Sequence, residues 1–215
     1  MPVTLHKVDA SIYLMTLTLN IIKAYKPWRL EQSTSKKHIK IIVQKALDLF
    51  PELSFVKEIE VTLLLTNNEQ MQDLNHQFRG KDKPTNVLSF SDTDIPYVRY
   101  SKENYLFQDE LTELSLLQSP DSCPLRNDIE IKKDYLLEID PGCDYINLGD
   151  IAFGYEIIVE EAKNQSKSFS DHFAHLLIHG VLHLLGFDHE KTYEAEIMEG
   201  LEIKALSNLA IASPY

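Results

Sequence analysis

The most informative part of the sequence is residues 179–189, His179-Gly180-Val181-Leu182-His183-Leu184-Leu185-Gly186-Phe187-Asp188-His189. Its first two histidines are one helical turn apart, so both imidazoles can reach a single metal ion. Gly186 readily adopts the left-handed conformation that ends a helix, and this turn would let His189 fold back toward the same ion. The spacing HxxxHxxGxxH therefore predicts a metal site with three imidazole ligands.

The histidine stretch continues a longer stripe. Five of the eight histidines fall between 172 and 189, and four of them, His172, His175, His179 and His183, share one face of a helix predicted at about 171–185 and capped by Ser170. The other faces are apolar, which indicates a buried helix. His175 is about 12 Å along the axis from His183 and cannot share its ion. His172 and His175 are predicted to pack or to support a ligand, with His175 a candidate substrate contact.

Position 180 separates this pattern from that of a peptidase. In HExxHxxGxxH metalloproteases the residue after the first histidine is the glutamate that acts as general base. Here that residue is Gly180, which cannot move a proton. Asp188 is placed either to orient a ligand imidazole or to face solvent.

Composition narrows the class of protein. Apolar residues make up 44% and charged residues 25% of the 215 residues, as in a soluble globular protein. The chain has no apolar run of 18 residues or more, and residues 11–22 alternate like a strand, so we expect no membrane partner. Cys123 and Cys143 form no CxxC pair, which favours the cytoplasm. The net charge of −12 means that the field of the whole molecule would repel nucleic acid. DNA is not among the partners that we expect.

Hydrophobic periodicity predicts an α/β (α+β) protein with a small mixed sheet of about four strands packed with about five helices. The strands are expected at about 15–22, 58–65, 87–90 and 148–153. The first helix follows Ser33, Thr34 and Ser35 and ends before Pro51, and a short second helix is capped by Asn67 or Asn68. The last three helices are expected at about 155–165, 171–185 and 192–209.

The middle of the chain has a different character. Residues 91–145 hold 13 acidic and 5 basic side chains, a net charge of −8, with four of the nine prolines and both cysteines. The sequence therefore predicts an extension at 1–14 and a single domain at 15–215 with an acidic insertion at about 91–146. Six apolar side chains of the insertion are expected to dock on the main body: Tyr105, Leu106, Leu111, Leu114, Leu116 and Leu117.

A small basic cluster stands out in the acidic chain. Arg79, Lys81 and Lys83 lie in one predicted polar loop. The planar guanidinium of arginine suits a phosphate, although a solvated loop explains the same residues.

Three motifs carry a resemblance to a known family. They are Arg79-Gly80-Lys81-Asp82-Lys83-Pro84-Thr85-Asn86-Val87-Leu88-Ser89-Phe90, Leu148-Gly149-Asp150-Ile151 and the histidine stretch 179–189, with Glu194-Ala195-Glu196 in the last helix. The chain resembles the YbeY family, bacterial endoribonucleases that take part in ribosomal RNA maturation. The resemblance covers about 15–90 and 147–209. Residues 1–14 and 91–145 depart from it, because the family usually has a short connection in place of the second segment.

The resemblance implies a zincin-like fold in which His179, His183 and His189 hold one zinc ion. It implies that Arg79 faces the metal across a cleft, and that Arg79 and His179 act in catalysis. The implied function is zinc-dependent, single-strand-specific cleavage of RNA, in maturation of the 3′ end of small-subunit (16S) ribosomal RNA and in ribosome quality control. The implied partners are single-stranded ribosomal RNA and the ribosome or its small subunit.

Two other functions compete with this hypothesis. A non-catalytic, zinc-bound ribosome assembly factor is disfavoured because structural zinc usually has four protein ligands. A metallopeptidase is disfavoured by Gly180 and by the basic loop. Nickel and manganese remain alternatives to zinc. The acidic insertion must either point away from an RNA-binding cleft or cover it as an autoinhibitory flap.

Overall fold

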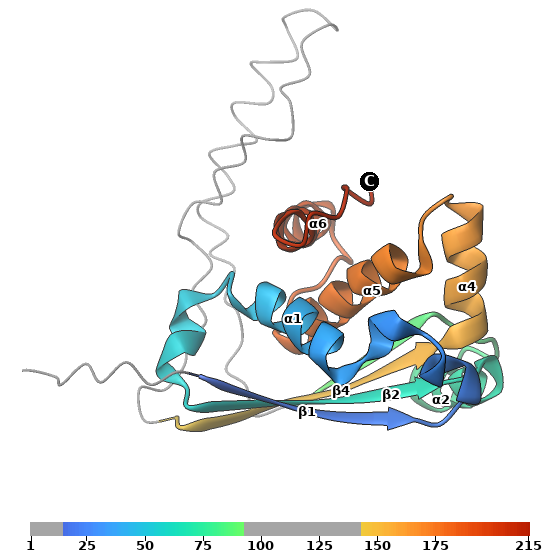
Figure 1. Cartoon of the computed structure of the whole chain (residues 1–215), viewed down its shortest axis with the longest axis horizontal. Helices are drawn as coiled ribbons and strands as arrows, with labels where there is room; N and C mark the ends of the chain where they lie inside the picture. Colours follow the sequence, from blue (N-terminus) through green and yellow to red (C-terminus); the bar gives the residue numbers. More distant parts are fainter. Residues whose placement is uncertain (1–14, 93–142) are drawn as a thin grey trace, which may run out of the picture.

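A computed structural model describes residues 15–92 and 143–215. The predicted extension 1–14 and nearly all of the predicted insertion, with its six docking side chains, lie outside the described residues. Figure 1 shows helices stacked on a small sheet. The strands are β1 (Thr16–Lys23), β2 (Glu58–Thr66), β3 (Val87–Ser91) and β4 (Tyr145–Gly154). The α-helices are α1 (Lys36–Leu47), α2 (Asn68–Arg79), α4 (Tyr155–Asn164), α5 (Phe169–Leu184) and α6 (Thr192–Ser207). Short 3-10 turns are η1 (Lys26–Arg29), η2 (Gln32–Thr34) and η3 (Pro51–Phe55).

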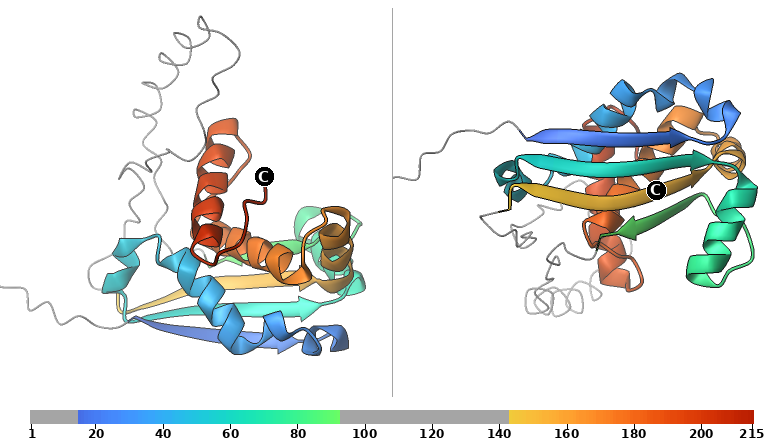
Figure 2. Two further views of the ribbon diagram at one scale, coloured as in Figure 1. Left: turned by 45° about the horizontal axis from the view of Figure 1, so that its top comes forward. Right: turned by 90° about the horizontal axis from the view of Figure 1, so that it is seen from below.

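The four strands form one mixed sheet in the order β1-β2-β4-β3. Strands β1, β2 and β4 run parallel, and β3 lies antiparallel to β4 at one edge, as the view from below shows (Figure 2). The predicted α/β class, with about four strands in a mixed sheet and about five helices, is confirmed. Among the described residues no helix is long and apolar enough to cross a membrane.

Strand alternation explains why helices cover one face of this sheet. Every second side chain of β2 is buried and points toward the helices. The buried side chains of β4 under α5 include Ile151 and Phe153. The opposite face carries a smaller apolar group in which Met71 of α2 covers Leu88 and Ala152. Period-two burial thus places most of the core between the sheet and the helices.

Helices α1 and α5 lie on the sheet, and α6 packs against both on the side away from the strands (Figure 1). The N-terminal end of α5 is anchored by aromatic packing around Trp28, which is fully buried. The ring of Trp28 meets Phe173 edge-on, with centroids 5.4 Å apart, and its indole N–H donates to the Thr66 carbonyl at 2.8 Å. These contacts join α5 to the end of β2 and fix where the helix begins.

Capping residues set the helix starts, with one correction. Ser35 caps α1 and Asn67 caps α2, as the sequence allowed. The predicted cap Ser170 is wrong, because Ser168 caps α5 by accepting the Asp171 backbone N–H at 3.0 Å. Ser168 has the extended backbone that a cap requires, whereas Ser170 already lies inside the helix.

Strand β4 begins three residues before the predicted start, because Tyr145 pairs with Glu58 of β2. Within β4, Gly149 has a φ of +115°, and a Cβ there would lie 2.1 Å from the Phe90 carbonyl oxygen. Only glycine fits so close to the neighbouring strand. This close approach accounts for the glycine of the Leu-Gly-Asp-Ile motif and lets β3 continue the sheet.

Candidate metal centre

The turn after α5 brings the three histidines of the stretch together. Gly186 has a φ of +89°, its N–H donates to the His183 carbonyl at 3.0 Å, and the Phe187 N–H donates to the Leu182 carbonyl at 3.0 Å. This is the left-handed helix end that the sequence predicted. The buried Phe187 ring packs on Phe50, with centroids 5.4 Å apart, and holds the returning chain in place.

One nitrogen from each of His179, His183 and His189 lies within 4.8 Å of the others. The Nε2 atoms of His179 and His183 are 3.0 Å apart. The His189 ring centroid lies 5.3 Å from that of His179 and 5.1 Å from that of His183. The first two rings are partly buried and His189 is exposed, so the group lies at the mouth of a cavity.

Hydrogen bonds fix which nitrogen of two of these rings is free. Nδ1 of His183 donates to the Phe187 carbonyl at 2.9 Å, and Nδ1 of His179 donates to a carboxylate oxygen of Glu202 at 2.8 Å. Carbonyl and carboxylate oxygens only accept, so both Nδ1 atoms carry the proton and both Nε2 atoms present lone pairs.

The two facing lone pairs provide a test of whether a metal ion fits. Nitrogen lone pairs 3.0 Å apart repel each other unless a cation lies between them. Tetrahedral imidazole ligands about 2.0–2.1 Å from zinc would have their nitrogens about 3.3 Å apart. The separation between His179 and His183 is close to this value, and the donor set of three neutral imidazoles suits zinc.

The electrostatics of the site favour the neutral form of His183. Burial, and then the neighbouring His179 and His189, lower the pKa of His183 to about 4. At neutral pH this ring is therefore an uncharged imidazole, which is the form that binds a metal.

Arg79 enters the same cavity from α2. The prediction that Arg79 lies in the polar loop is wrong, because Arg79 is the last residue of α2 and Gly80, with a φ of +66°, ends the helix after it. The following loop is fastened to α2, because the buried Asn75 amide donates to the Lys83 carbonyl at 2.7 Å and Gln72 donates to Asp82 at 2.8 Å. The exposed Arg79 lines one cavity with the three histidines.

Strand β3 forms the wall between the arginine and the metal helix. The Ser89 hydroxyl donates to the Gly180 carbonyl at 3.3 Å, and the Ser91 hydroxyl donates to the Leu184 carbonyl at 3.1 Å. Both serines line the cavity. The two bonds hold the edge strand against α5 and so set the position of the loop that precedes it.

The packing of α5 explains Gly180. A Cβ at this position would lie 3.0 Å from Cγ2 of Ile151 and 3.3 Å from the hydroxyl of Ser89. The helix therefore packs so closely on β3 and β4 that any Cβ at this position would force Ile151 or Ser89 to shift. A side chain at position 180 would begin against the sheet, so this position supplies no general base.

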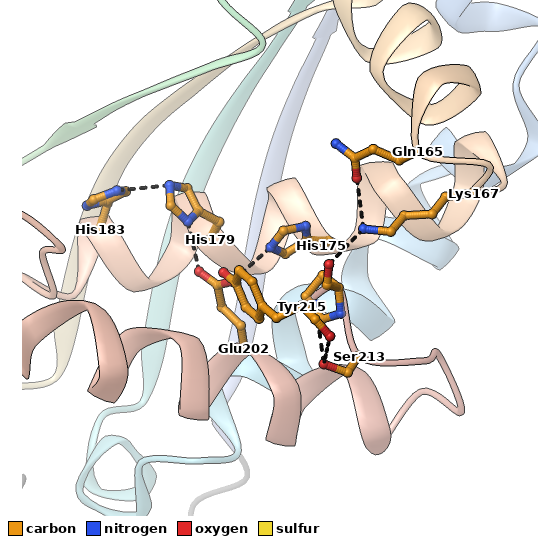
Figure 3. A network of polar contacts seen from close by, with 9 residues as sticks. Gln165, Lys167, His175, His179, His183, Glu202, Ser213 and Tyr215 are labelled. Atoms are coloured by element: carbon orange, nitrogen blue, oxygen red, sulfur yellow. Dashed lines mark hydrogen bonds and ion pairs between the residues drawn. The ribbon is translucent and has the colours of Figure 1, made fainter. Parts of the chain in front are cut away.

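The most informative residue of the site was not predicted. Glu202 of α6 is 1% exposed and accepts hydrogen bonds from His179, from Nε2 of His175 at 2.8 Å and from the Tyr215 hydroxyl at 2.5 Å (Figure 3). Burial alone would raise its pKa, but the bonds from His175 and His179 outweigh burial and lower it to about 2. The sequence did contain one indication of this residue: Glu202 follows Met198 by four residues and therefore lies on the same, buried face of α6.

The remaining histidines of the stripe lie outside the metal group. His172 is buried and its Nε2 bonds to Glu161 at 2.8 Å, and Glu161 also accepts the Asn86 amide at 3.0 Å. His175 bonds to Glu202 instead. Asp188 accepts the backbone N–H of His189 at 2.8 Å. His172 therefore joins α5 to α4, His175 joins α5 to α6, and Asp188 stabilises the turn after α5.

The fold and the site define a mixed α/β protein with three histidines and an arginine around one cavity. The family model for Endoribonuclease YbeY matches residues 28–210. The chain is 34% identical over 174 residues to Endoribonuclease YbeY of Francisella tularensis subsp. novicida (strain U112), covering 81% of this chain and 82% of that protein. The chain therefore belongs to the YbeY endoribonuclease family, which confirms the resemblance and supports an RNA-cleaving hydrolase.

A solved structure also matches over most of the chain. It is the solution structure of TM1509 from Thermotoga maritima, with a TM-score of 0.43 and 18% sequence identity, covering 90% of this chain and 92% of that one.

Proposed function

We propose that this protein is a zinc-dependent, single-strand-specific endoribonuclease, with His179, His183 and His189 holding the ion. The observation that carries the proposal is that the nitrogens of these histidines share one cavity with Arg79. Membership of an endoribonuclease family supports the same activity. A three-ligand site leaves a coordination position for water or a substrate oxygen, as catalytic zinc requires.

The chemistry divides between the ion and the chain. When bound, zinc supplies Lewis acidity and lowers the pKa of water. Arg79 would bind a phosphate oxygen through its guanidinium and offset the negative charge that grows during cleavage of the phosphodiester. The exposed position of Arg79 leaves its donors accessible from solvent.

The chain's other residues position these groups. The Phe187 carbonyl and Glu202 keep the Nδ1 protons of His183 and His179 in place, so that both Nε2 atoms face the centre. The bonds from Ser89 and Ser91 to α5 hold the wall of the cavity beside Arg79. Gly180 supplies no proton acceptor, which separates this site from that of the HExxH peptidases.

The substrate we propose is single-stranded ribosomal RNA, in particular the 3′ end of small-subunit RNA, cleaved during maturation and quality control of ribosomes in the cytoplasm. The exposed Lys81 and Lys83 next to Arg79 support an RNA backbone at this loop. The ribosomal role is the one that the family resemblance implies.

The experiment offers the zinc-loaded protein three substrates: a single-stranded RNA with a small-subunit 3′ end sequence, the same RNA as a duplex, and a peptide library. We expect cleavage of the single strand only. Peptide cleavage with intact RNA would contradict the proposal in favour of a metallopeptidase. An intact RNA over a range of salt and metal, together with co-sedimentation with small ribosomal subunits, would favour a non-catalytic assembly factor.

A further inference from the structure

The buried carboxylate of Glu202 lies behind the metal centre and uses both of its oxygens. Oε1 accepts the proton of Nδ1 of His179 at 2.8 Å. Oε2 accepts from Nε2 of His175 at 2.8 Å and from the Tyr215 hydroxyl at 2.5 Å. Figure 3 shows Glu202 reaching from α6 between the histidines of α5, with Tyr215 beside it. Two donors from α5 and one from the C-terminal residue Tyr215 thus hold one carboxylate.

The hydrogen-bond partners of the Glu202 carboxylate can all act as donors, so the carboxylate acts as an acceptor. Nδ1 of His175 is buried and has no hydrogen-bond partner within residues 15–92 and 143–215, so its single ring proton belongs on Nε2, where Glu202 accepts it. The Tyr215 hydroxyl must likewise donate, because an ionised carboxylate has no proton to give. All three groups therefore donate to Glu202, and the carboxylate acts only as an acceptor.

We propose that Glu202 is a positioning residue that holds His179 in the Nδ1–H tautomer, so that Nε2 presents its lone pair to the metal centre. His175 and Tyr215 hold the carboxylate itself in place. A carboxylate behind a ligand imidazole fixes the orientation of the ring and raises its basicity, and such partners change metal affinity by about 10–100-fold. The metal part of this inference rests on the proposed function, whereas the tautomer does not.

The burial of Glu202 supports this role over a general stabilising one. Removing a carboxylate from water is costly unless its partners compensate, so an apolar residue at this position would be the simpler way to fill the core. Apart from Glu194 in the first turn, the other buried residues described in α6 are apolar, among them Met198, Leu201 and Ala205. The free-energy cost of burying the Glu202 carboxylate is explained if its function is to keep the ring proton of His179 on Nδ1.

The first test needs neither metal nor RNA. Imidazole nitrogen NMR of the metal-free protein, assigned with a His179→Gln variant, reports which ring nitrogen carries the proton. We expect His179 with its proton on Nδ1 in the native chain, and a mixture of tautomers in Glu202→Gln. A proton on Nε2 in the native chain would overturn the inference, whatever the outcome of the RNase assay.

The second test measures zinc affinity by competition with a chromophoric chelator, with the visible spectrum of the cobalt-substituted protein as a spectroscopic readout. Glu202→Gln should weaken zinc binding at least tenfold and alter the cobalt spectrum. The matched control is Glu60→Gln, because Glu60 also accepts a tyrosine hydroxyl, that of Tyr145 at 2.7 Å, but is on the outer face of the sheet. Equal affinities and spectra for the native chain and both variants would overturn the inference.

Discussion

Arg79 is the residue on which the proposed chemistry depends most after the histidines. Its guanidinium lines the cavity of the candidate metal centre without an ion-pair partner among the described residues, so it is available for a phosphate. Arg79→Ala should lower the rate of RNA cleavage about 10²–10³-fold, the usual effect of removing one group that stabilises transition-state charge. Zinc content should stay unchanged, because no ligand is altered. A cleavage assay with metal analysis measures both.

Lys81→Ala is the matched control for Arg79, because Lys81 is exposed two residues after Arg79, in the loop that follows α2. It should cost less than tenfold, since a lysine near the backbone of RNA contributes mainly to binding. Full activity in Arg79→Ala, or an equal loss in both variants, would contradict the role given to the arginine.

The three histidines of the candidate site could be predicted from the sequence, whereas the groups that hold them in place could not. The histidine spacing and Gly186 predicted which rings meet, because one helical turn and a left-handed residue are local geometry. Glu202 was missed because a glutamate in a helix usually faces solvent, and only the packing of α6 on α5 reveals that this one is buried. The partner of His183 was also hidden, since a backbone carbonyl leaves no mark in the sequence.

At the scale of elements, the contact between α5 and the sheet can be tested at Gly180. Gly180→Ala should lower the free energy of unfolding by about 1–3 kcal/mol, because the new methyl group overlaps the tight contact with Ile151 and Ser89. Gly200 of α6 is the control, since a Cβ there meets nothing within 4 Å. Gly200→Ala should raise stability by up to about 1 kcal/mol. Urea unfolding measures both, and a stabilised Gly180→Ala would contradict the packing described.

The elements themselves were largely predictable, with errors at their ends. Ser35 and Asn67 cap their helices because each precedes an apolar stripe with helical spacing. The start of α5 was misplaced because Ser166, Ser168 and Ser170 alternate, and only the packing of the helix selects one of them. The first residues of β4 were missed because Tyr145 is half exposed and adjoins the polar segment, so its pairing with Glu58 is visible only in the sheet.

At the scale of the whole molecule, the charge of −12 opposes RNA binding, and a local cluster must supply the attraction. If Arg79, Lys81 and Lys83 each meet one phosphate, log K should fall with log salt with a slope of about −2. Raising salt from about 50 mM to about 200 mM should then weaken binding of single-stranded RNA about 20-fold. Fluorescence anisotropy at several salt concentrations gives the slope. An RNA affinity that does not change with salt concentration would contradict a contact based on phosphates.

The acidic middle segment can be tested by shortening it. Strand pairing places Asp92 beside Leu148, since its N–H donates to the Leu148 carbonyl at 3.2 Å. A flexible linker of about ten residues can therefore replace residues 93–142 and still close the hairpin of β3 and β4. The replacement removes 11 acidic and 5 basic side chains. We expect a folded protein with unchanged zinc content and tighter RNA binding at low salt.

The result of this replacement also decides between the two hypotheses for the segment. A large rise in cleavage rate supports an autoinhibitory flap, and an unchanged rate supports a segment that points away from the cleft. Loss of the folded core, seen as loss of cooperative unfolding, would contradict the expectation that the described residues hold together without it.

The proposed zinc-dependent cleavage of RNA is tested most directly by measuring metal content together with RNA cleavage in the native chain and in His183→Ala. We expect about one zinc per native chain, cleavage of a single-stranded ribosomal RNA 3′ fragment, and loss of both in the variant, because His183 would supply one of three ligand nitrogens. Circular dichroism confirms that the variant remains folded. A native chain that binds zinc tightly but leaves the RNA intact, or a variant that cleaves RNA without metal, would contradict it.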